Sequence, residues 1–507
     1  MMRSFKHRLM MILPALLLIL FSSLRAPAQS SGSDSALLPV NAMLDDYRFL
    51  RHKLQTTHPG LYKRRSKEAM QELMDSLQST IKEPLPFREF YQKIAFLIAE
   101  TRCEHSYANP GKRYAALLKQ WKMLPFQLFF SSVRPIVLVN GTADPAIQPG
   151  DEVVSINGKG IDSIVRAIYP YIPADGFMTS SRDHFLSSMN FNVAYNQFIE
   201  EAVSYTLVVR KPDGTLISRR FDTGLDFSSI NKNALANPVN KPVLDASSRL
   251  EKARKEQLAL RFEKTVPVAV MTVRSFAVDK KAFIKKIDGF FAEIASRNPT
   301  DLIIDLSYNG GGEEELAAYL MSYLIAKPTK FMKEEYLINI DDSTLALANL
   351  PAEVRRNKYA YIDSMRDGRS LAKISELSME LKTMEPRQNG YHGRVWIYAN
   401  GATSSAASTF CAVAQSNHRA VIVGDETAGS FSGGGAVIGI DLTLPYSGIT
   451  THTSIVYQEF ATSGRDPLRG VVPDVAYKPV FSELIGQNRE WVEVILRLRE
   501  KMVVGGE

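Results

Sequence analysis

The spacing of apolar residues changes along the chain, and the first part has a helical spacing. Between residues 37 and 120 apolar side chains recur every three or four positions, as at Leu44, Tyr47, Leu50 and Leu54. This period is typical of amphipathic helices that bury one face. We therefore expect an N-terminal helical region over residues 37–120.

Short runs of alternating apolar residues follow over residues 121–225. The stretch PGDEVVSINGKGI, Pro149–Ile161, predicts a turn, a strand, an Asn-Gly turn and the start of a helix. Asp213-Gly214 predicts a hairpin turn between two further strands. A β-rich unit is therefore expected here.

From about residue 240 to 485, apolar strands alternate with helical segments. The runs VPVAVMTV and DLIIDLSYNGGG are apolar throughout, and the second leads directly into a helix-like stretch. Such repetition of strand, turn and helix indicates an α/β core. A charged, helix-prone segment over about 341–385 interrupts the repetition and is expected to be an insertion.

The first residues have the features of a targeting segment. A basic start precedes an apolar run from Leu9 to Phe21 and the small-residue sequence Ala26-Pro27-Ala28. We expect a signal peptide over residues 1–28 and export to the periplasm or the outside of a bacterial cell. The apolar run is shorter than the roughly 20 residues of a spanning helix, so a retained anchor is the weaker alternative and no stable membrane span is expected after cleavage.

Composition narrows the possible functions. The chain has 507 residues and 45% apolar composition, enough for several domains. Its net charge of +7 includes four basic residues of the leader, which leaves a mature chain too weakly basic to predict nucleic-acid binding. Cys103 and Cys411 are too few for a disulfide scaffold or a cysteine-rich metal site, and they either pair with each other or are two separate buried thiols. We expect no metal and no cofactor.

Two segments could carry chemistry. In ANGATSSAASTFCAVAQ, Ser404 and Ser405 stand where a strand turns into a helix, and helix N-terminal amides favour negative charge. The same position suits a simple helix cap. The glycines Gly310–Gly312 permit a close backbone approach, as in an oxyanion hole, a phosphate cradle or a flexible connection. A phosphate loop of the Walker type is disfavoured because no Lys-Ser or Lys-Thr follows.

Four motifs in order carry a resemblance to a known family. LIIDLSYNGGG, NGATSSAAS, VGDETAG and GVVPD resemble the tail-specific, or C-terminal processing, serine peptidases, and the likeness extends over about Leu44–Asp474. The resemblance implies a crotonase/ClpP-like α/β peptidase core over residues 240–485. The stretch PGDEVVSINGKGI further resembles part of a PDZ domain, so that residues 121–225 are expected to be a PDZ-like domain that selects C-terminal tails.

The resemblance also assigns the nucleophile and the oxyanion hole. Matched position by position, the nucleophile is Ser405, and the hole is formed by the amides of Ala406 and Gly311. One branch of the family uses a lysine base, but Ser430 stands at that position, and residues 383–477 contain no lysine. The tricorn-like branch, which uses a histidine, is therefore expected.

Of the eight histidines, His105 matches the histidine of the family's upstream motif, whereas His392, His418 and His452 match no motif. An imidazole with a pKa of about 6.5 can take the serine proton and return it to the leaving amine. The carboxylate that orients it is expected to be Asp466, with Glu459 as the alternative. Glu104 is adjacent to His105 in sequence, but neighbouring side chains often point apart.

Three positions depart from the family pattern. Cys103 replaces an aspartate, Ser307 an arginine and Ser408 a glutamate. They favour the alternative of a catalytically inactive relative that binds peptides or apolar ligands, whereas the retained Ser405 and His105 favour an endopeptidase acting on proteins or peptides. The oligomeric state is left open. Residues 126–221 are expected to be dispensable for hydrolysis of short activated esters.

Overall fold

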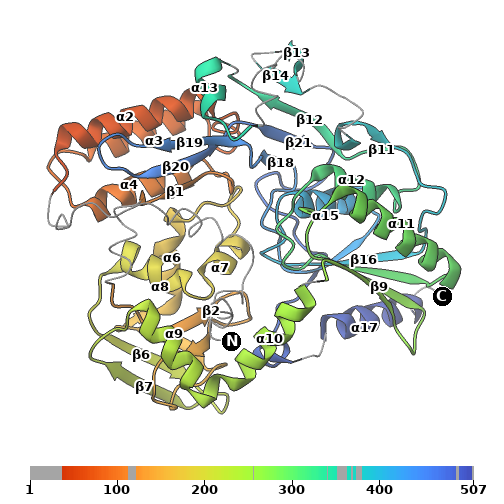
Figure 1. Ribbon diagram of the computed structural model, residues 1–507, viewed down its shortest axis with the longest axis horizontal. Coiled ribbons are helices and arrows are strands. Elements are labelled where there is room, and N and C mark those ends of the chain that lie inside the picture. The colour runs from red at the N-terminus through yellow and green to blue at the C-terminus, as the bar shows by residue number, and fades with distance from the viewer. Residues whose placement is uncertain are drawn as a thin grey trace.

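The computed structural model shows three groups of elements arranged around a shared centre (Figure 1). The predicted leader, residues 1–28, lies outside the described residues. The described residues are 37–111, 121–254, 256–339, 341–350, 362–366, 369–372, 379–486 and 490–504. Among them, no helix is both long enough and apolar enough to cross a membrane.

The N-terminal helices pack against a small sheet from the other end of the chain. Helix α2 (Val40–Thr57), α3 (Lys67–Ser79) and α4 (Phe87–Ala99) share a core with strand β19 (Gly439–Thr443). Strand β19 pairs antiparallel with β20 (Thr450–Ser454). The predicted stripe of α2 is the buried one, since Tyr47, Leu50 and Leu54 have no exposed surface.

Strand β1 (Tyr107–Asn109) pairs antiparallel with β20, with Tyr107 opposite His452. The segment that carries His105 is thereby fixed to strands that lie far along the chain.

The middle of the chain forms an antiparallel sheet with its own core. The sheet order is β2-β3-β4-β6-β7, and helix α6 (Ile161–Ile168) packs beside it. The predicted Asn157-Gly158 turn is present, with φ of 50° and 75°. Assignment of this unit, which we call the inserted domain, to a PDZ-like fold stays a prediction. Its strands are β2 (Phe126–Phe129), β3 (Ile136–Asn140), β4 (Glu152–Ile156), β6 (Tyr205–Arg210) and β7 (Leu216–Phe221).

The expected α/β core is confirmed. Its six-stranded sheet has the order β22-β17-β16-β10-β9-β8, and all neighbours are parallel except β8, which runs antiparallel to β9. Both faces of the sheet are covered, which explains the continuous apolar runs in its strands. The strands are β8 (Leu258–Phe262), β9 (Val268–Val273), β10 (Asp301–Asp305), β16 (Arg394–Ala399), β17 (Val421–Gly424) and β22 (Val475–Ala476).

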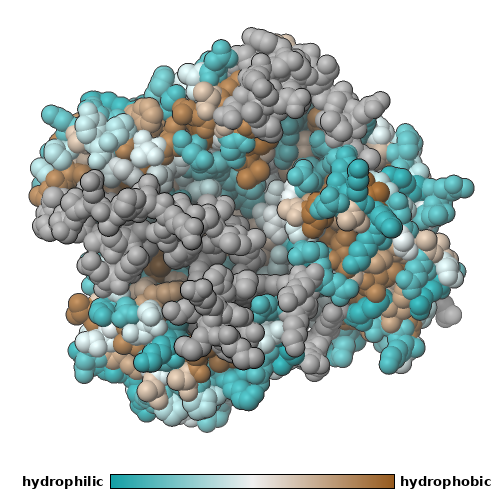
Figure 2. All heavy atoms as spheres, in the orientation of Figure 1, coloured by the Kyte–Doolittle hydropathy of each residue, from teal (hydrophilic) through white to brown (hydrophobic). Residues whose placement is uncertain are grey.

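Helices of different origin cover the two faces. Helix α11 (Lys280–Arg297), α12 (Glu314–Ser322) and α15 (Ala406–Ser416) lie on one face, and α17 (Glu490–Val504) lies on the other (Figure 1). In the space-filling view, hydrophobic side chains gather over the part of the visible face formed by α11 (Figure 2).

The segment expected to be a helix-prone insertion is mixed in its described residues. It contains one short helix, α13 (Asp342–Leu347), and two strands, β13 (Ile362–Arg366) and β14 (Arg369–Ala372). Strand β14 extends a second sheet by pairing with β12 (Met332–Leu337). The charged sequence predicted helix, but residues 362–366 and 369–372 form strands because β14 pairs with β12 and β13 pairs with β14. Other parts of the segment lie outside the described residues.

Candidate active site

Ser405 is the last residue of a sharp turn between β16 and α15. Its φ of 51° and ψ of −130° lie in a region that non-glycine residues seldom adopt. Its side chain makes no capping hydrogen bond to α15, although it stands at the cap position. The turn is fixed from outside: the amide of Ser404 donates to the Asn309 carbonyl at 3.0 Å, and the Thr403 hydroxyl donates to the Leu306 carbonyl at 2.9 Å. A strained backbone held in this way is typical of functional positions.

The glycine turn after β10 lies directly against Ser405. Gly311 has a φ of 93°, and a side-chain carbon added to it would lie 2.6 Å from the Cβ of Ser405. Asn309 holds this turn, because its Oδ1 accepts the Gly311 amide at 2.9 Å and its Nδ2 donates to the Val273 carbonyl at 3.0 Å. A glycine is therefore required at position 311.

The two amides expected to form the oxyanion hole differ in availability. Among the described residues, no acceptor takes the amide of Ala406, which opens the first turn of α15. The amide of Gly311, in contrast, donates to the side chain of Asn309. One of the two predicted donors is thus free, and the other is engaged.

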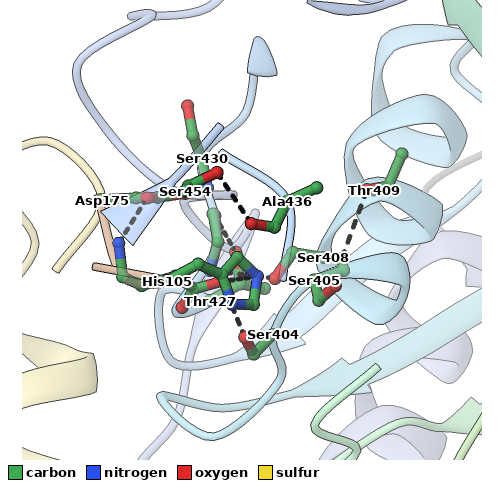
Figure 3. A network of polar contacts seen from close by, with 12 residues as sticks. His105, Asp175, Ser404, Ser405, Ser408, Thr409, Thr427, Ser430, Ala436 and Ser454 are labelled. Atoms are coloured by element: carbon green, nitrogen blue, oxygen red, sulfur yellow. Dashed lines mark hydrogen bonds and ion pairs between the residues drawn. The ribbon is translucent and has the colours of Figure 1, made fainter. Parts of the chain in front are cut away.

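His105 lies beside the serine turn (Figure 3), and Glu104 contacts both. Glu104 Oε1 accepts the Ser404 hydroxyl at 2.7 Å and lies 3.7 Å from His105 Nε2. The nearby Ser405 amide also acts to lower the pKa of Glu104. No hydrogen bond joins the His105 ring to the Ser405 hydroxyl in the part of the chain that the structure describes. Glu104, which sequence alone left out of the site, therefore faces the serine turn.

Burial affects the protonation of both residues. It lowers the pKa of His105; the charge of Asp175 opposes this effect, and His452 adds to it. Burial raises the pKa of Glu104, while the bonds from Ser404 and the Ser405 amide oppose that rise. The imidazole is thus neutral, and able to accept a proton, at a lower pH than an exposed histidine.

Neither carboxylate chosen from the sequence contacts His105. Asp466 is exposed, and its Oδ1 accepts the amide of Leu468 at 2.8 Å in a local turn. Glu459 lies on β21 (Tyr457–Phe460), where its Oε1 pairs with Lys63 Nζ at 2.6 Å. Their role toward the histidine stays a prediction without a supporting contact.

Sequence reasoning missed Asp175, a buried aspartate of the inserted domain. It is labelled at the left of Figure 3 and is 4% exposed. Oδ1 accepts the Glu104 amide at 2.9 Å, and Oδ2 accepts the Ser430 amide at 3.2 Å. Burial and the nearby charge of Glu104 raise the pKa of Asp175 to about 7. No motif marks this aspartate, because only folding brings its loop to the site.

Two of the three departures from the family pattern have local replacements. Arg274, which directly follows β9, donates to both carboxylate oxygens of Asp305, at 3.2 and 2.8 Å, and to the Ser307 carbonyl at 2.9 Å. An arginine from the end of the adjacent strand is thus present where Ser307 supplies none. Ser408 Oγ donates to the Thr403 carbonyl at 2.7 Å and accepts the Gly429 amide at 3.0 Å, which joins the serine turn to the next glycine-rich turn.

The third departure, Cys103, is also accounted for. Cys103 and Cys411 are both buried and unpaired. Burial is the main reason that the pKa of the Cys103 thiol is raised to about 12, and the charge of Asp175 contributes. A carboxylate is therefore present near position 103, although it comes from another part of the chain.

An arginine approaches the position at which the other branch of the family has its lysine. Arg64 Nη2 donates to Ser430 Oγ at 2.6 Å and to the Gly433 carbonyl at 2.8 Å. A guanidinium does not lose its proton in proteins, so Arg64 is unable to act as a base.

The comparisons agree with this architecture. Residues 267–477 match the model of peptidase family S41. A structure of mature CPAF complexed with lactacystin has a TM-score of 0.60 at 16% identity, covering 92% of this chain and 99% of that chain. A second structure of mature CPAF has a TM-score of 0.58 at 16% identity, covering 92% and 98%. At this identity the likeness shows the fold alone. No curated protein sequence matches the chain.

The family match and the strained serine at the head of a helix define a serine peptidase. Its substrates are accordingly proteins or peptides. Within this class, residues 267–477 are similar to peptidase family S41, the tail-specific peptidases.

Gly311 and Gly310 offer a matched test of the contact with Ser405. Gly311→Ala is expected to lower peptidase activity by about 10²-fold or more, because the new side chain displaces the nucleophile. Gly310→Ala should retain activity, since nothing lies within 4 Å of an added carbon there. Initial rates on a peptide substrate, with circular dichroism to check folding, measure both variants; equal activity in the two would contradict the assignment.

Proposed function

We propose that this chain is an exported endopeptidase that cleaves peptide bonds with Ser405 as nucleophile and His105 as general base. The observation that carries the proposal is the strained Ser405, uncapped and next to the free amide of Ala406, with His105 on the neighbouring segment. Export rests on residues 1–28, which lie outside the described residues.

The reaction proceeds through an acyl-enzyme. His105 takes the proton from the Ser405 hydroxyl as its oxygen attacks the substrate carbonyl carbon, and the carbonyl oxygen becomes negatively charged. The Ala406 amide stabilises that charge, with Gly311 as second donor once its amide leaves Asn309. His105 then protonates the leaving amine, which breaks the peptide bond. Water, deprotonated by His105, finally hydrolyses the ester.

Substrate binding has to bring the imidazole and the hydroxyl into hydrogen-bonding contact. In the described structure the Glu104 carboxylate instead accepts the Ser404 hydroxyl and lies 3.7 Å from His105 Nε2. Catalytic hydrogen bonds often become short only in the substrate complex. A shift of the Glu104 side chain is therefore part of the proposed cycle.

The alternative of an inactive binding protein has no specific observation in its favour. It was motivated by Cys103, Ser307 and Ser408, and each of these positions has a replacement in the structure, from Asp175, Arg274 and the Ser408 hydroxyl itself.

Alanine variants of Ser405 and Ser404 distinguish the nucleophile from its neighbour. Ser405→Ala is expected to lose activity by about 10³-fold or more, because no other group can form the ester. Ser404→Ala should lose no more than about tenfold, since its hydroxyl only supports Glu104. The readouts are peptide hydrolysis and peptide mapping after labelling with a fluorophosphonate; label on Ser404, or full activity of Ser405→Ala, would refute the assignment.

The pH dependence tests the base. As pH rises, His105 loses its proton and kcat/KM should rise; because burial lowers the pKa of His105, the midpoint is expected below the ordinary histidine value of 6.5. This rise of kcat/KM with pH is the rising limb of the pH profile. His105→Ala should abolish the rising limb and lower activity by about 10³-fold.

His418→Ala is the control for this measurement. His418 lines a cavity of about 670 Å³ with Arg394 and Val421, the first residues of β16 and β17, whereas Ser405 follows the last residue of β16. Activity lost in His418→Ala, and retained in His105→Ala, would place the base elsewhere.

Selection of C-terminal tails is the finer part of the proposal. It rests on the resemblance of Pro149–Ile161 to a PDZ domain and on the antiparallel sheet of the inserted domain, whose strands could accept a peptide as an added strand. A peptide with a free C-terminal carboxylate should then be cleaved with a lower KM than its C-terminal amide. Equal KM values for the two peptides would exclude recognition of the carboxylate.

A further inference from the structure

One wall of the candidate active site comes from the inserted domain. Asp175 lies in the loop between the short 3-10 helix η3 (Tyr169–Tyr171) and α7 (Ser180–Leu186). Its two carboxylate oxygens accept amides from different segments, Glu104 on one side and Ser430 on the other. This single side chain therefore joins the segment that carries His105 to the glycine-rich turn of the peptidase core.

The rest of the loop is seated just as closely. The Gly176 amide donates to the Arg102 carbonyl at 3.3 Å, and the Phe177 amide donates to the Leu468 carbonyl at 3.2 Å. The Arg102 guanidinium lies 4.7 Å from the centre of the Phe177 ring. Gly176 has a φ of 56°, and a side-chain carbon there would lie 2.2 Å from the Leu468 carbonyl oxygen. The loop thus fits only with glycine at this position.

Among the charges around this loop, that of Asp175 favours a protonated His105. Asp175 interacts electrostatically with Glu104, Arg64, His105, Cys103 and Tyr457. The charges of Asp175 and His452 act on the pKa of His105, and Glu104 Oε1 lies 3.7 Å from His105 Nε2. Burial lowers the pKa of His105, and of these groups it is Asp175 whose charge raises it.

We propose that Asp175 is a positioning residue for His105. It holds the main chain of Glu104 in place, and its negative charge stabilises the imidazolium that forms when His105 takes the proton of Ser405. The inference rests on the proposed function, since it requires His105 to be the base. It also revises the expectation that residues 126–221 are dispensable for chemistry on short esters, because their removal would take Asp175 away.

Asp175→Asn in the full-length chain tests this role. We expect kcat to fall by about 10²-fold, because asparagine has a single acceptor oxygen for the two amides of Glu104 and Ser430 and carries no negative charge. In the wild-type chain the charge of Asp175, which ionises near pH 7, extends the rising limb of kcat/KM upwards by favouring the protonated imidazole. Asp175→Asn should remove that upper part, so the limb should move to lower pH. Both are measured on a short peptide substrate.

Asp151→Asn is the matched control. Asp151 is also buried in the inserted domain, 2% exposed, where it accepts the Gln148 amide at 2.7 Å and pairs with Lys211 at 2.8 Å. This variant should lose thermal stability and leave the pH of the limb unchanged. A merely structural role of Asp175 would give the same result, so an unshifted limb in Asp175→Asn, whatever its rate, overturns the proposal.

A second measurement needs no change at Asp175. The imidazole resonances of His105 in Ser405→Ala, followed by NMR against pH, should show a second inflection from the ionisation of Asp175, and a single inflection overturns the proposal. The proposed function is judged separately by the activity of Ser405→Ala. If that variant is inactive and the limb of Asp175→Asn does not move, the inference on Asp175 alone fails.

Discussion

The close contact between the glycine turn after β10 and the serine turn after β16 is the constraint on which the site depends. These two strands are parallel neighbours, so their carboxyl ends bring the two turns together. The backbone of Gly311 approaches Ser405 so closely that no side chain fits between them, and Asn309 and Leu306 accept hydrogen bonds from the serine turn. The unfavourable backbone angles of Ser405 persist because its surroundings leave no alternative.

The candidate site is composite, and groups from other segments lie near the positions that depart from the family pattern. The serine and the glycine turn belong to the sheet, His105 arrives on a segment paired with β20, and Asp175 comes from the inserted domain. A charge that is missing at one position can therefore be supplied by another segment, as Arg274 does beside Ser307. What is retained is the type of group near the serine, while its origin in the chain differs.

Local patterns predicted the elements well and the contacts between distant segments poorly. The period of Leu50 and Leu54 identified the buried face of α2, and the apolar runs identified the parallel strands, because both signals depend on burial alone. Ser404 and Ser405 could be placed at a strand-to-helix turn for the same reason. Asp175 could not be found, since its role arises only when its loop reaches Glu104. The direction of the Glu104 side chain likewise depends on Ser404, which is 300 positions away.

The pairing of β1 with β20 has a consequence for the timing of activity during synthesis. Chains are made from the N-terminus, and domains fold as they emerge. The histidine segment is completed early, but Ser405 comes much later, and the strand that holds the histidine segment extends to Ser454. A nascent chain that ends before this strand lacks part of the framework of the site. The order of the segments thus delays the appearance of peptidase activity until synthesis has passed Ser454.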